Sequence, residues 1–180
     1  MEAINLEIEG LILFKPVIYK DNRGYFLETQ RKSHLNEAEI TDDFVQENES
    51  LSIRNVIRGL HFQVPPHPQA KLLRVVKGKA IDVAVDLRKN SPTYGKYLMI
   101  ELNETEKQSF YIPIGFAHGF ISLADETILL YKCSDYYSKE CEKTIAWDDP
   151  TLNIPWNCKA PILSDKDRNG ILFDDFNSPF

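Results

Sequence analysis

The stretch that decides the fold is Lys71–Leu87, KLLRVVKGKAIDVAVDL, which contains two strand-like runs. Leu72–Val76 is short and mostly apolar, and Lys77-Gly78-Lys79 bounds it as a turn signal. Ala80–Leu87 then alternates apolar and polar residues over part of its length, as a strand with one buried face does. This stretch predicts two β-strands.

The segments on either side also read mainly as strands. Turn signals such as Asp21–Gly24 and Asn90–Thr93 separate them. The strand-like segments are Glu7–Phe14, Tyr25–Thr29, the region from Val45 through Gln63, Tyr97–Leu102, Gln108–Ile112, Phe116–Leu123 and Thr127–Tyr137. This spacing, without alternating long helices, is typical of an antiparallel β-sandwich or barrel such as a jelly roll.

Helical patterns are short. Lys32–Ile40 is the best candidate, with Ser33 as its cap and Leu35 and Ala38 on its apolar face. The chain after Pro161 predicts irregular structure, although Ile171–Phe173 and Phe176 indicate that it packs on the rest. A length of 180 residues suits one domain, 1–180.

Charge and composition exclude several classes of protein. The 27 acidic residues against 21 basic ones argue against general nucleic-acid binding, but a few basic side chains suffice for one nucleotide diphosphate. No apolar run reaches the roughly 20 residues of a membrane helix, and the N-terminus does not resemble a signal peptide. The odd number of cysteines without a CxxC pair predicts free thiols, and we expect the cytoplasm.

The histidines are the first candidates for chemistry. His34 falls in the predicted helix and His67 between prolines, so we expect a surface and a loop position. His61 and His118 instead lie in apolar strand-like stretches with glycines beside them, which permit close approach of a ligand or another backbone. The simplest interpretation is a pair of hydrogen-bonded core histidines.

Two kinds of site remain as alternatives. A metal site is disfavoured because His61 has no second histidine within two residues and no third ligand is apparent. Acid–base chemistry needs a base, an acid and a cation, for which His61, Tyr131 and Lys71 are candidates, with Asp167 to orient the histidine. Each also has a structural interpretation: a core tyrosine, a solvated lysine, and an aspartate that caps a turn.

Motifs between Lys15 and Asp167 supply a further argument. They are Arg58–Gln63, Pro68–Leu72, Val83–Arg88, Ser91–Gly95, Ile112-Pro113, Gly115–Phe120, Tyr131-Lys132, Asp135–Tyr137, Trp147–Pro150, Ile154–Trp156 and Leu163–Asp167. Together, in this order, they resemble the dTDP-4-dehydrorhamnose 3,5-epimerase family. Residues 15–167 would then form the core, and 168–180 an irregular tail without an assigned motif.

The resemblance implies a cupin-type jelly roll with short helices, without metal or cofactor, that forms a homodimer. It also implies an isomerase that converts dTDP-4-keto-6-deoxyglucose to dTDP-4-keto-L-rhamnose by inverting carbons 3 and 5. The ketone at carbon 4 acidifies the neighbouring protons. A base removes one, an enolate forms, and an acid returns a proton from the opposite face.

The resemblance also assigns residues. His61 matches the family's proton acceptor, Asp167 its partner, Tyr131 the proton donor, and Lys71 the cation that stabilises the enolate. Arg23 and Arg58 match positions that hold the diphosphate, and Tyr137 an aromatic that stacks on thymine. The other ligand-contact positions are Glu28, Gln46, Glu47, Asn48, His118, Glu142 and Lys166.

The chain departs from the family pattern at two places. Ser138–Thr144 lacks the usual Pro and Gly, and Glu47 stands where Asp is common. The sequence leaves open an epimerase that inverts one carbon or acts on another nucleotide sugar. A non-catalytic nucleotide-sugar-binding cupin is a third possibility, which the joint presence of His61, Lys71, Tyr131 and Asp167 argues against. A metal-dependent cupin is disfavoured by the missing ligands.

Overall fold

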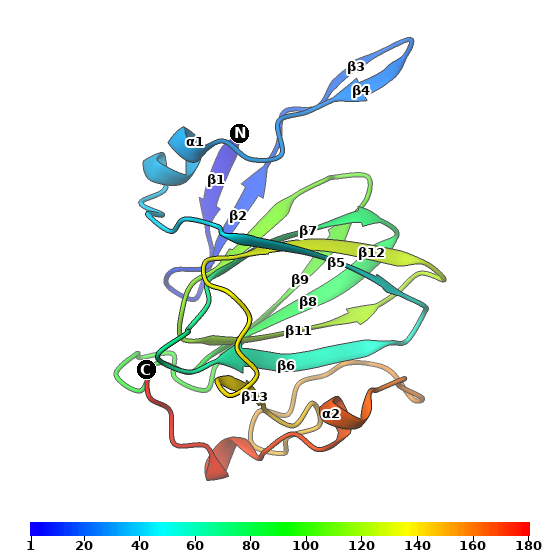
Figure 1. The fold of residues 1–180 in the computed structure, drawn as a ribbon. Coiled ribbons are helices and arrows are strands. Elements are labelled where there is room, and N and C mark those ends of the chain that lie inside the picture. Colours follow the sequence, from blue (N-terminus) through cyan, green and yellow to red (C-terminus); the bar gives the residue numbers. More distant parts are fainter.

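The computed structural model describes the whole chain, Met1–Phe180, and consists mainly of two antiparallel β-sheets packed face to face (Figure 1). The six-stranded sheet has the order β1 (Glu2–Asn5), β2 (Ile12–Lys15), β10 (Ser109–Ile112), β7 (Lys71–Lys77), β12 (Thr127–Cys133), β5 (Gln46–Ser52). The five-stranded sheet has the order β13 (Glu142–Thr144), β6 (Ile57–Gln63), β11 (Phe116–Ser122), β8 (Lys79–Asp86), β9 (Tyr97–Asn103). The predicted antiparallel β-sandwich is confirmed.

The turn at Gly78 carries the chain from one sheet to the other. The two strands that flank it do not pair with each other, because β7 belongs to the six-stranded sheet and β8 to the five-stranded sheet. Gly78 has φ +76°, and a Cβ there would lie 2.2 Å from the carbonyl oxygen of Glu126. Only glycine fits this crossing.

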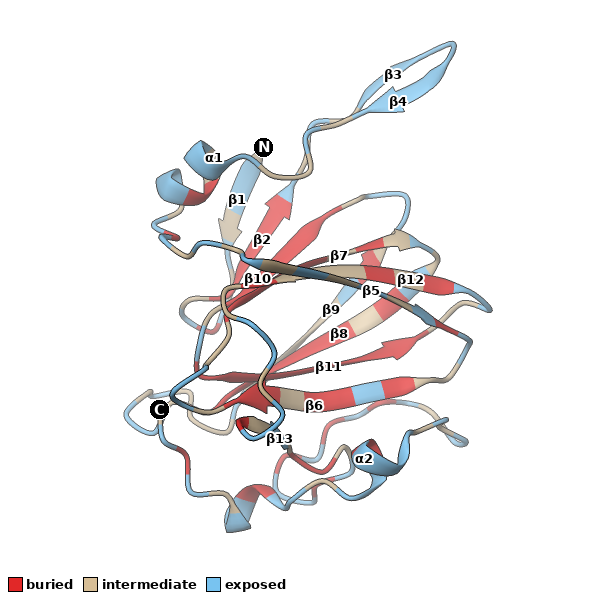
Figure 2. Cartoon of the chain, in the orientation of Figure 1, coloured by how far each residue is buried: buried red, intermediate tan, exposed pale blue.

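The interior between the sheets is the main core. It contains aliphatic and aromatic side chains from both sheets, among them Leu73, Phe110, Phe116 and Leu129. A second core covers the outer face of the five-stranded sheet, where the chain after β13 packs. Buried on both faces, β11 has no exposed residue, as Figure 2 shows.

The C-terminal part of the chain contains more regular secondary structure than predicted. It contains α2 (Asp165–Arg168) and a 3-10 helix, η1 (Phe173–Asp175). Ser164 caps α2 by accepting a hydrogen bond from the backbone of Asp167, a local signal that the turn-like composition concealed. Phe173 is buried in the second core, which confirms that the tail packs on the rest of the chain.

Near the N-terminus, β3 (Tyr19–Asp21) and β4 (Gly24–Phe26) form a hairpin that projects away from the sandwich (Figure 1). α1 (Lys32–Glu37) follows it and packs Leu35 against the outer face of the six-stranded sheet. The prediction that Ser33 caps this helix is wrong. The N-cap is Arg31, whose side chain makes no capping hydrogen bond to the helix, so packing of Leu35 rather than capping holds the helix.

Some predicted strands are too long. The strand expected over Thr127–Tyr137 ends at Cys133, and that over Tyr25–Thr29 is reduced to Gly24–Phe26. After Cys133 the backbone leaves the ladder because Ser134 and Asp135 instead bond to the segment before β7 through Ala70 and Gln69.

Candidate active site

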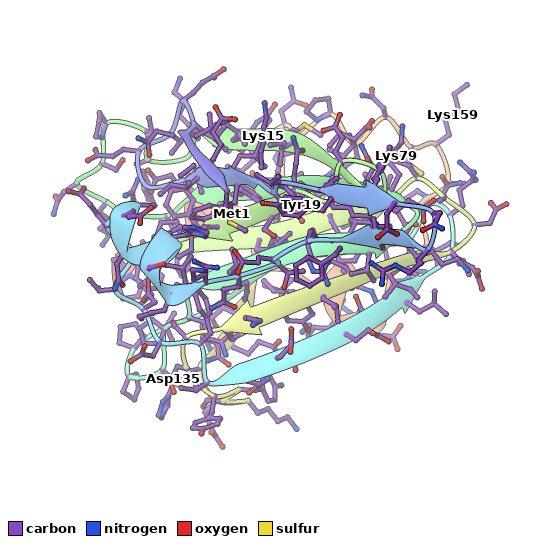
Figure 3. All side chains as sticks on the ribbon, turned by 90° about the horizontal axis from the view of Figure 1, so that it is seen from above. Met1, Lys15, Tyr19, Lys79, Asp135 and Lys159 are labelled. Carbon is purple, nitrogen blue, oxygen red and sulfur yellow. The ribbon has the colours of Figure 1, made fainter.

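A cavity of about 430 Å³ opens between the two sheets. It lies near the end of the sandwich where Asp135 is labelled in Figure 3, whereas Lys79 marks the opposite end. The cavity is lined by Gln46, Asn48, Ser50, Arg58, His61, Phe62, Gln63, Gln69, Lys71, His118, Phe120, Leu129, Tyr131, Cys133, Tyr137, Glu142 and Lys166. Polar and charged side chains therefore replace the apolar core at this end.

Strand periodicity brings many of these residues together. Alternate residues of a strand share one face, and those that face the cavity are Gln46, Asn48 and Ser50 of β5, and Leu129, Tyr131 and Cys133 of β12. Cys133 lies directly opposite Lys71 of β7 in the ladder. The six-stranded sheet thus supplies one wall with Tyr131 and Lys71 on it.

The opposite wall depends on an irregularity in β6. His118 of β11 pairs with His61, but Phe120 pairs with Arg58, so β6 carries one extra residue between the two pairs. In a regular strand, residues three apart face opposite sides. Because of this bulge, Arg58 and His61 both line the cavity.

His61 is held by a buried carboxylate. Its Nε2 lies 2.5 Å from Oδ1 of Asp167, which also accepts a hydrogen bond from the Gly59 amide. Ser164 donates to Oδ2 of Asp167 at 2.6 Å. Burial opposes the charge on Asp167, but these hydrogen bonds lower its pKa to about 2. Burial lowers the pKa of His61, and Asp167 partly restores it, so the ring is neutral and basic at pH 7.

His118 has its own carboxylate. Its Nε2 lies 2.9 Å from Oδ2 of Asp82, a fully buried residue of β8. The cavity therefore contains two adjacent histidines on neighbouring strands, each hydrogen-bonded to a different aspartate. The interpretation of His61 and His118 as hydrogen-bonded histidines is correct, but both border a cavity rather than a closed core.

Lys71 and Tyr131 face them from the other sheet. Lys71 is only 9% exposed and forms no hydrogen bond or ion pair within the protein. Burial lowers its pKa, whereas Cys133 and Glu142 raise it. Burial raises the pKa of Tyr131, so its hydroxyl keeps its proton at neutral pH. A lysine in this position is not the solvated lysine of the structural interpretation.

The rim of the cavity is polar and charged. Tyr137 donates its hydroxyl hydrogen to Glu142 at 3.0 Å, and Lys166 bonds the same carboxylate at 2.7 Å. Burial opposes the charge on Glu142, but the Lys166 ammonium lowers its pKa. Arg58 donates to the Ser52 hydroxyl at 3.0 Å. Positive side chains and an exposed aromatic ring therefore lie together at the opening.

Three residues that the sequence assigned to the site lie elsewhere. Arg23 is on the projecting hairpin, where it pairs with Asp21 and its side chain is 86% exposed. Glu28 follows the hairpin and pairs with Arg31. The side chain of Glu47 is exposed on the outer face of the sheet, because it alternates with Gln46 and Asn48.

Other residues at the site escaped the sequence analysis. Gln63 links the loop after β6 to the loop after β12 by donating to the carbonyl of His67 at 2.6 Å and accepting from the Ser138 amide at 2.7 Å. Ser50, Gln69, Phe120, Leu129 and Cys133 also line the cavity. Because alternate residues of a strand share a face, Leu129 and Cys133 could have been predicted from Tyr131, which lies two positions from each. Asp82 gave no such signal, because its partner is in another strand.

No three His, Cys, Asp or Glu side chains lie close enough together to hold a metal ion. No helix is long and apolar enough to cross a membrane.

The fold and the cavity define a β-sandwich protein whose site can take up and return protons, since a histidine–aspartate pair and a half-buried tyrosine face each other beside a lysine. Comparison with known proteins extends this. Residues 5–175 match the family model for dTDP-4-dehydrorhamnose 3,5-epimerase. The enzyme of that name from Methanothermobacter thermautotrophicus is 47% identical over 169 residues, 92% of this chain and 91% of that protein.

Solved structures are also similar to this chain over most of its length. dTDP-6-deoxy-D-glucose-3,5-epimerase from Legionella pneumophila, in complex with dTDP-4-keto-L-rhamnose, is 42% identical with a TM-score of 0.94 and covers 98% of this chain and 94% of its own. ChmJ, a 3'-monoepimerase from Streptomyces bikiniensis in complex with dTDP-quinovose, is 35% identical with a TM-score of 0.86, covering 93% and 85%. The chain belongs to the dTDP-4-dehydrorhamnose 3,5-epimerase family. It is an isomerase with the cupin-type fold that the sequence predicts.

Proposed function

We propose that the protein inverts carbons 3 and 5 of dTDP-4-keto-6-deoxyglucose, with His61 as base and Tyr131 as acid. The observation that carries the proposal is the placement of these two residues on opposite walls of one cavity. A proton removed on one face of the sugar and returned on the other inverts the carbon between them. Family membership supports the substrate class.

His61 begins each inversion. Asp167 holds the ring through Nε2, so the nitrogen that takes the substrate proton is Nδ1. When Nδ1 is protonated, the Asp167 carboxylate stabilises the imidazolium. Because burial lowers the pKa of His61, the free base is the dominant form at neutral pH. The residue is therefore ready to accept a proton before substrate binds.

Lys71 and Tyr131 complete the reaction. As carbon 3 or carbon 5 loses its proton, negative charge moves to the oxygen on carbon 4, and the unpartnered ammonium of Lys71 stabilises it. The raised pKa of Tyr131 keeps a proton on its hydroxyl for delivery to the carbanionic carbon. The charge then returns from the oxygen and the ketone re-forms. Proton exchange with solvent then removes the proton from His61 and restores the one on Tyr131, and a second round inverts the other carbon.

The cavity rim suits the nucleotide. Arg58 and Lys166 offer positive charge for the diphosphate. Tyr137, 55% exposed, offers a free ring face to thymine, and Glu142 holds its hydroxyl. Gln46, Asn48 and His118 are further polar contacts inside the cavity.

A homodimer accounts for Arg23 and Glu28. Arg23 lies on the hairpin that projects from the sandwich and Glu28 follows it, so these side chains serve the cavity of a second copy rather than their own. Support for a second copy comes from exposed apolar side chains, which include Tyr19, Tyr25 and Phe26 on the hairpin and, separately, Leu51 and Ile53 at the C-terminal end of β5. The free thiols and a nucleotide-sugar substrate favour the cytoplasm.

The test is incubation with dTDP-4-keto-6-deoxyglucose in heavy water, with deuterium at carbons 3 and 5 read by NMR. Label at both carbons, and rhamnose after addition of a 4-keto reductase with NADPH, is the expected result. Label at one carbon would favour a single-centre epimerase, a candidate that the likeness to the Streptomyces bikiniensis 3'-monoepimerase keeps open. No label from a folded protein that binds dTDP would favour a non-catalytic binder.

A further inference from the structure

Asp82 is a fully buried carboxylate that the proton transfers above do not use. Its Oδ2 lies 2.9 Å from Nε2 of His118, whereas its Oδ1 is buried without any hydrogen-bond partner. A buried carboxylate with one oxygen unsatisfied is unfavourable unless positive charge lies near it. To remain ionised, Asp82 therefore needs a cation in its surroundings.

Two side chains on opposite walls of the cavity can supply that positive charge. His118 extends from β11, and Lys71 from β7 in the other sheet. Burial raises the pKa of Asp82, while the charges of His118 and Lys71 lower it. The same attraction works in reverse, because the Asp82 carboxylate favours the protonated form of Lys71. Asp82 is thus the common counter-charge of both side chains.

The orientation of His118 leaves a second nitrogen for the cavity. Nε2 is engaged by Asp82, and the ring lines the cavity with no protein partner at Nδ1. A carboxylate that accepts the Nε2 hydrogen also stabilises a ring with hydrogens on both nitrogens. Nδ1–H and the Lys71 ammonium are then two unpartnered donors on opposite walls.

We propose that Asp82 is a positioning residue of the epimerase, which keeps the His118 ring doubly protonated with Nδ1–H directed into the cavity. Resting on the proposed function, this makes His118 and Lys71 a pair of donors for the oxygen on carbon 4. When His61 takes the carbon proton, the developing charge on that oxygen is stabilised by both hydrogen bonds, and neither donor gives up its proton. When Tyr131 returns a proton to carbon, the ketone re-forms. Asp82 itself does not contact the sugar.

The protonation state of His118 tests the proposal directly. With ¹⁵N-labelled histidine, the ring nitrogens of all four histidines are resolved by NMR, and His118→Asn assigns the signal. Both nitrogens of His118 should carry hydrogen at pH 7 in the wild type. In Asp82→Asn, the amide oxygen accepts from Nε2–H and Nδ1 should lose its hydrogen. A singly protonated His118 in the wild type would overturn the proposal without the need for any variant.

Asp86→Asn is the matched control. Asp86 is also fully buried on β8, but it bonds Arg88, Ser91 and Thr93 outside the cavity. This variant should keep the wild-type signals of His118, although its melting temperature falls. Loss of the Nδ1 hydrogen in both variants would mean that the ring responds to general destabilisation, and would also overturn the proposal.

Kinetics supply the second readout. Asp82→Asn should lower kcat on the order of 100-fold, because donors act on charge that develops in the transition state. KM for the 4-keto sugar and Kd for dTDP should stay within a few-fold, and Asp86→Asn should leave kcat unchanged. Unchanged kcat in Asp82→Asn would contradict the positioning role. A wild type that exchanges no deuterium would instead contradict the proposed function, and the NMR comparison would still decide the role of Asp82.

Discussion

Gly59 of β6 lies against Gly119 of β11 so closely that a Cβ on Gly59 would be 2.5 Å from the Cα of Gly119. This contact lies within the bulge that turns both Arg58 and His61 toward the cavity. The prediction that glycines beside the two histidines permit close backbone approach is therefore confirmed, and the approaching backbone is that of the neighbouring strand.

Gly59→Ala should lower the free energy of unfolding by several kcal/mol, on the order of 3–5. The new methyl group would meet backbone atoms, which cannot rotate away as a side chain can, and φ is +124°. Urea unfolding measures the effect. Gly24→Ala is the matched control, since Gly24 has φ +134° but no atom within 4 Å of an added Cβ. Equal losses in both variants would show that backbone conformation, rather than the contact with Gly119, is responsible.

The strands were predictable because alternation and turn signals are local. The bulge was not, because it depends on which residues of β6 pair with β11, and pairing partners are far apart in sequence. The same distance concealed Asp82 as the partner of His118. Asp167 is 106 residues from His61, and only the family resemblance linked them.

Two of the candidates that lie outside the cavity of their own chain do so for different reasons. Glu47 shares a strand with Gln46 and Asn48, and strand alternation alone would have put its side chain on the outer face. Arg23 follows a turn signal that was recognised, but no local pattern says where a hairpin points. A contact with a second chain, as proposed for Arg23, cannot be derived from the periodicity of one chain.

His61→Asn should abolish deuterium exchange at both carbons, with a loss of at least about 1,000-fold, because His61 is the proposed base at both carbons and His118, as proposed above, already carries both ring protons. His67→Asn is the matched control, since His67 also pairs with an aspartate, Asp135 at 3.0 Å, but lies outside the cavity. Exchange is followed by mass spectrometry in heavy water. Normal exchange in His61→Asn would remove His61 from the role of base.

Tyr131→Phe should slow completion of the epimerisation about 100-fold while Kd for dTDP changes little. The substitution removes only the hydroxyl that carries the proton. Product formation is coupled to a 4-keto reductase, and Kd is measured by calorimetry. Tyr111→Phe is the control, because Tyr111 is a buried strand tyrosine whose hydroxyl bonds Asp42 away from the cavity. Weakened binding with unchanged turnover would contradict the assignment of the donor.

Asp167→Asn should move the acidic limb of the kcat/KM profile to lower pH. Activity falls as pH drops through the pKa of His61, which burial lowers and Asp167 raises. Removing the negative charge therefore lowers that pKa further. Turnover at the plateau should fall roughly tenfold or more, since the imidazolium loses its counter-charge. Asp165→Asn, an exposed position on the same helix, is the control. A limb that moves to higher pH would contradict this electrostatic role.

The same carboxylate predicts a dependence of stability on pH. Its pKa is about 2 in the folded chain, below the ordinary value of 3.8, so its contribution is complete above about pH 4. It is lost as the pH falls from 4 toward 2, and amounts to about 2 kcal/mol. Urea unfolding of the wild type and Asp167→Asn over this range isolates it, because the other carboxylates titrate in both proteins. If the free energy of unfolding changed with pH by the same amount in the wild type and in Asp167→Asn, the prediction would be contradicted.

Subunit complementation tests whether Arg23 serves the cavity of a second copy. Arg23→Ala and His61→Asn should each be nearly inactive alone. In a mixed dimer, the Arg23→Ala subunit keeps an intact cavity and receives Arg23 from its partner, so one of the two sites works. Random exchange of an equal mixture should therefore restore about a quarter of wild-type activity. A mixture of His61→Asn and Tyr131→Phe is the control, because both changes lie in the cavity and neither subunit can repair the other. Restoration in the control would point to contamination, and its absence in both mixtures would place Arg23 in the service of its own chain.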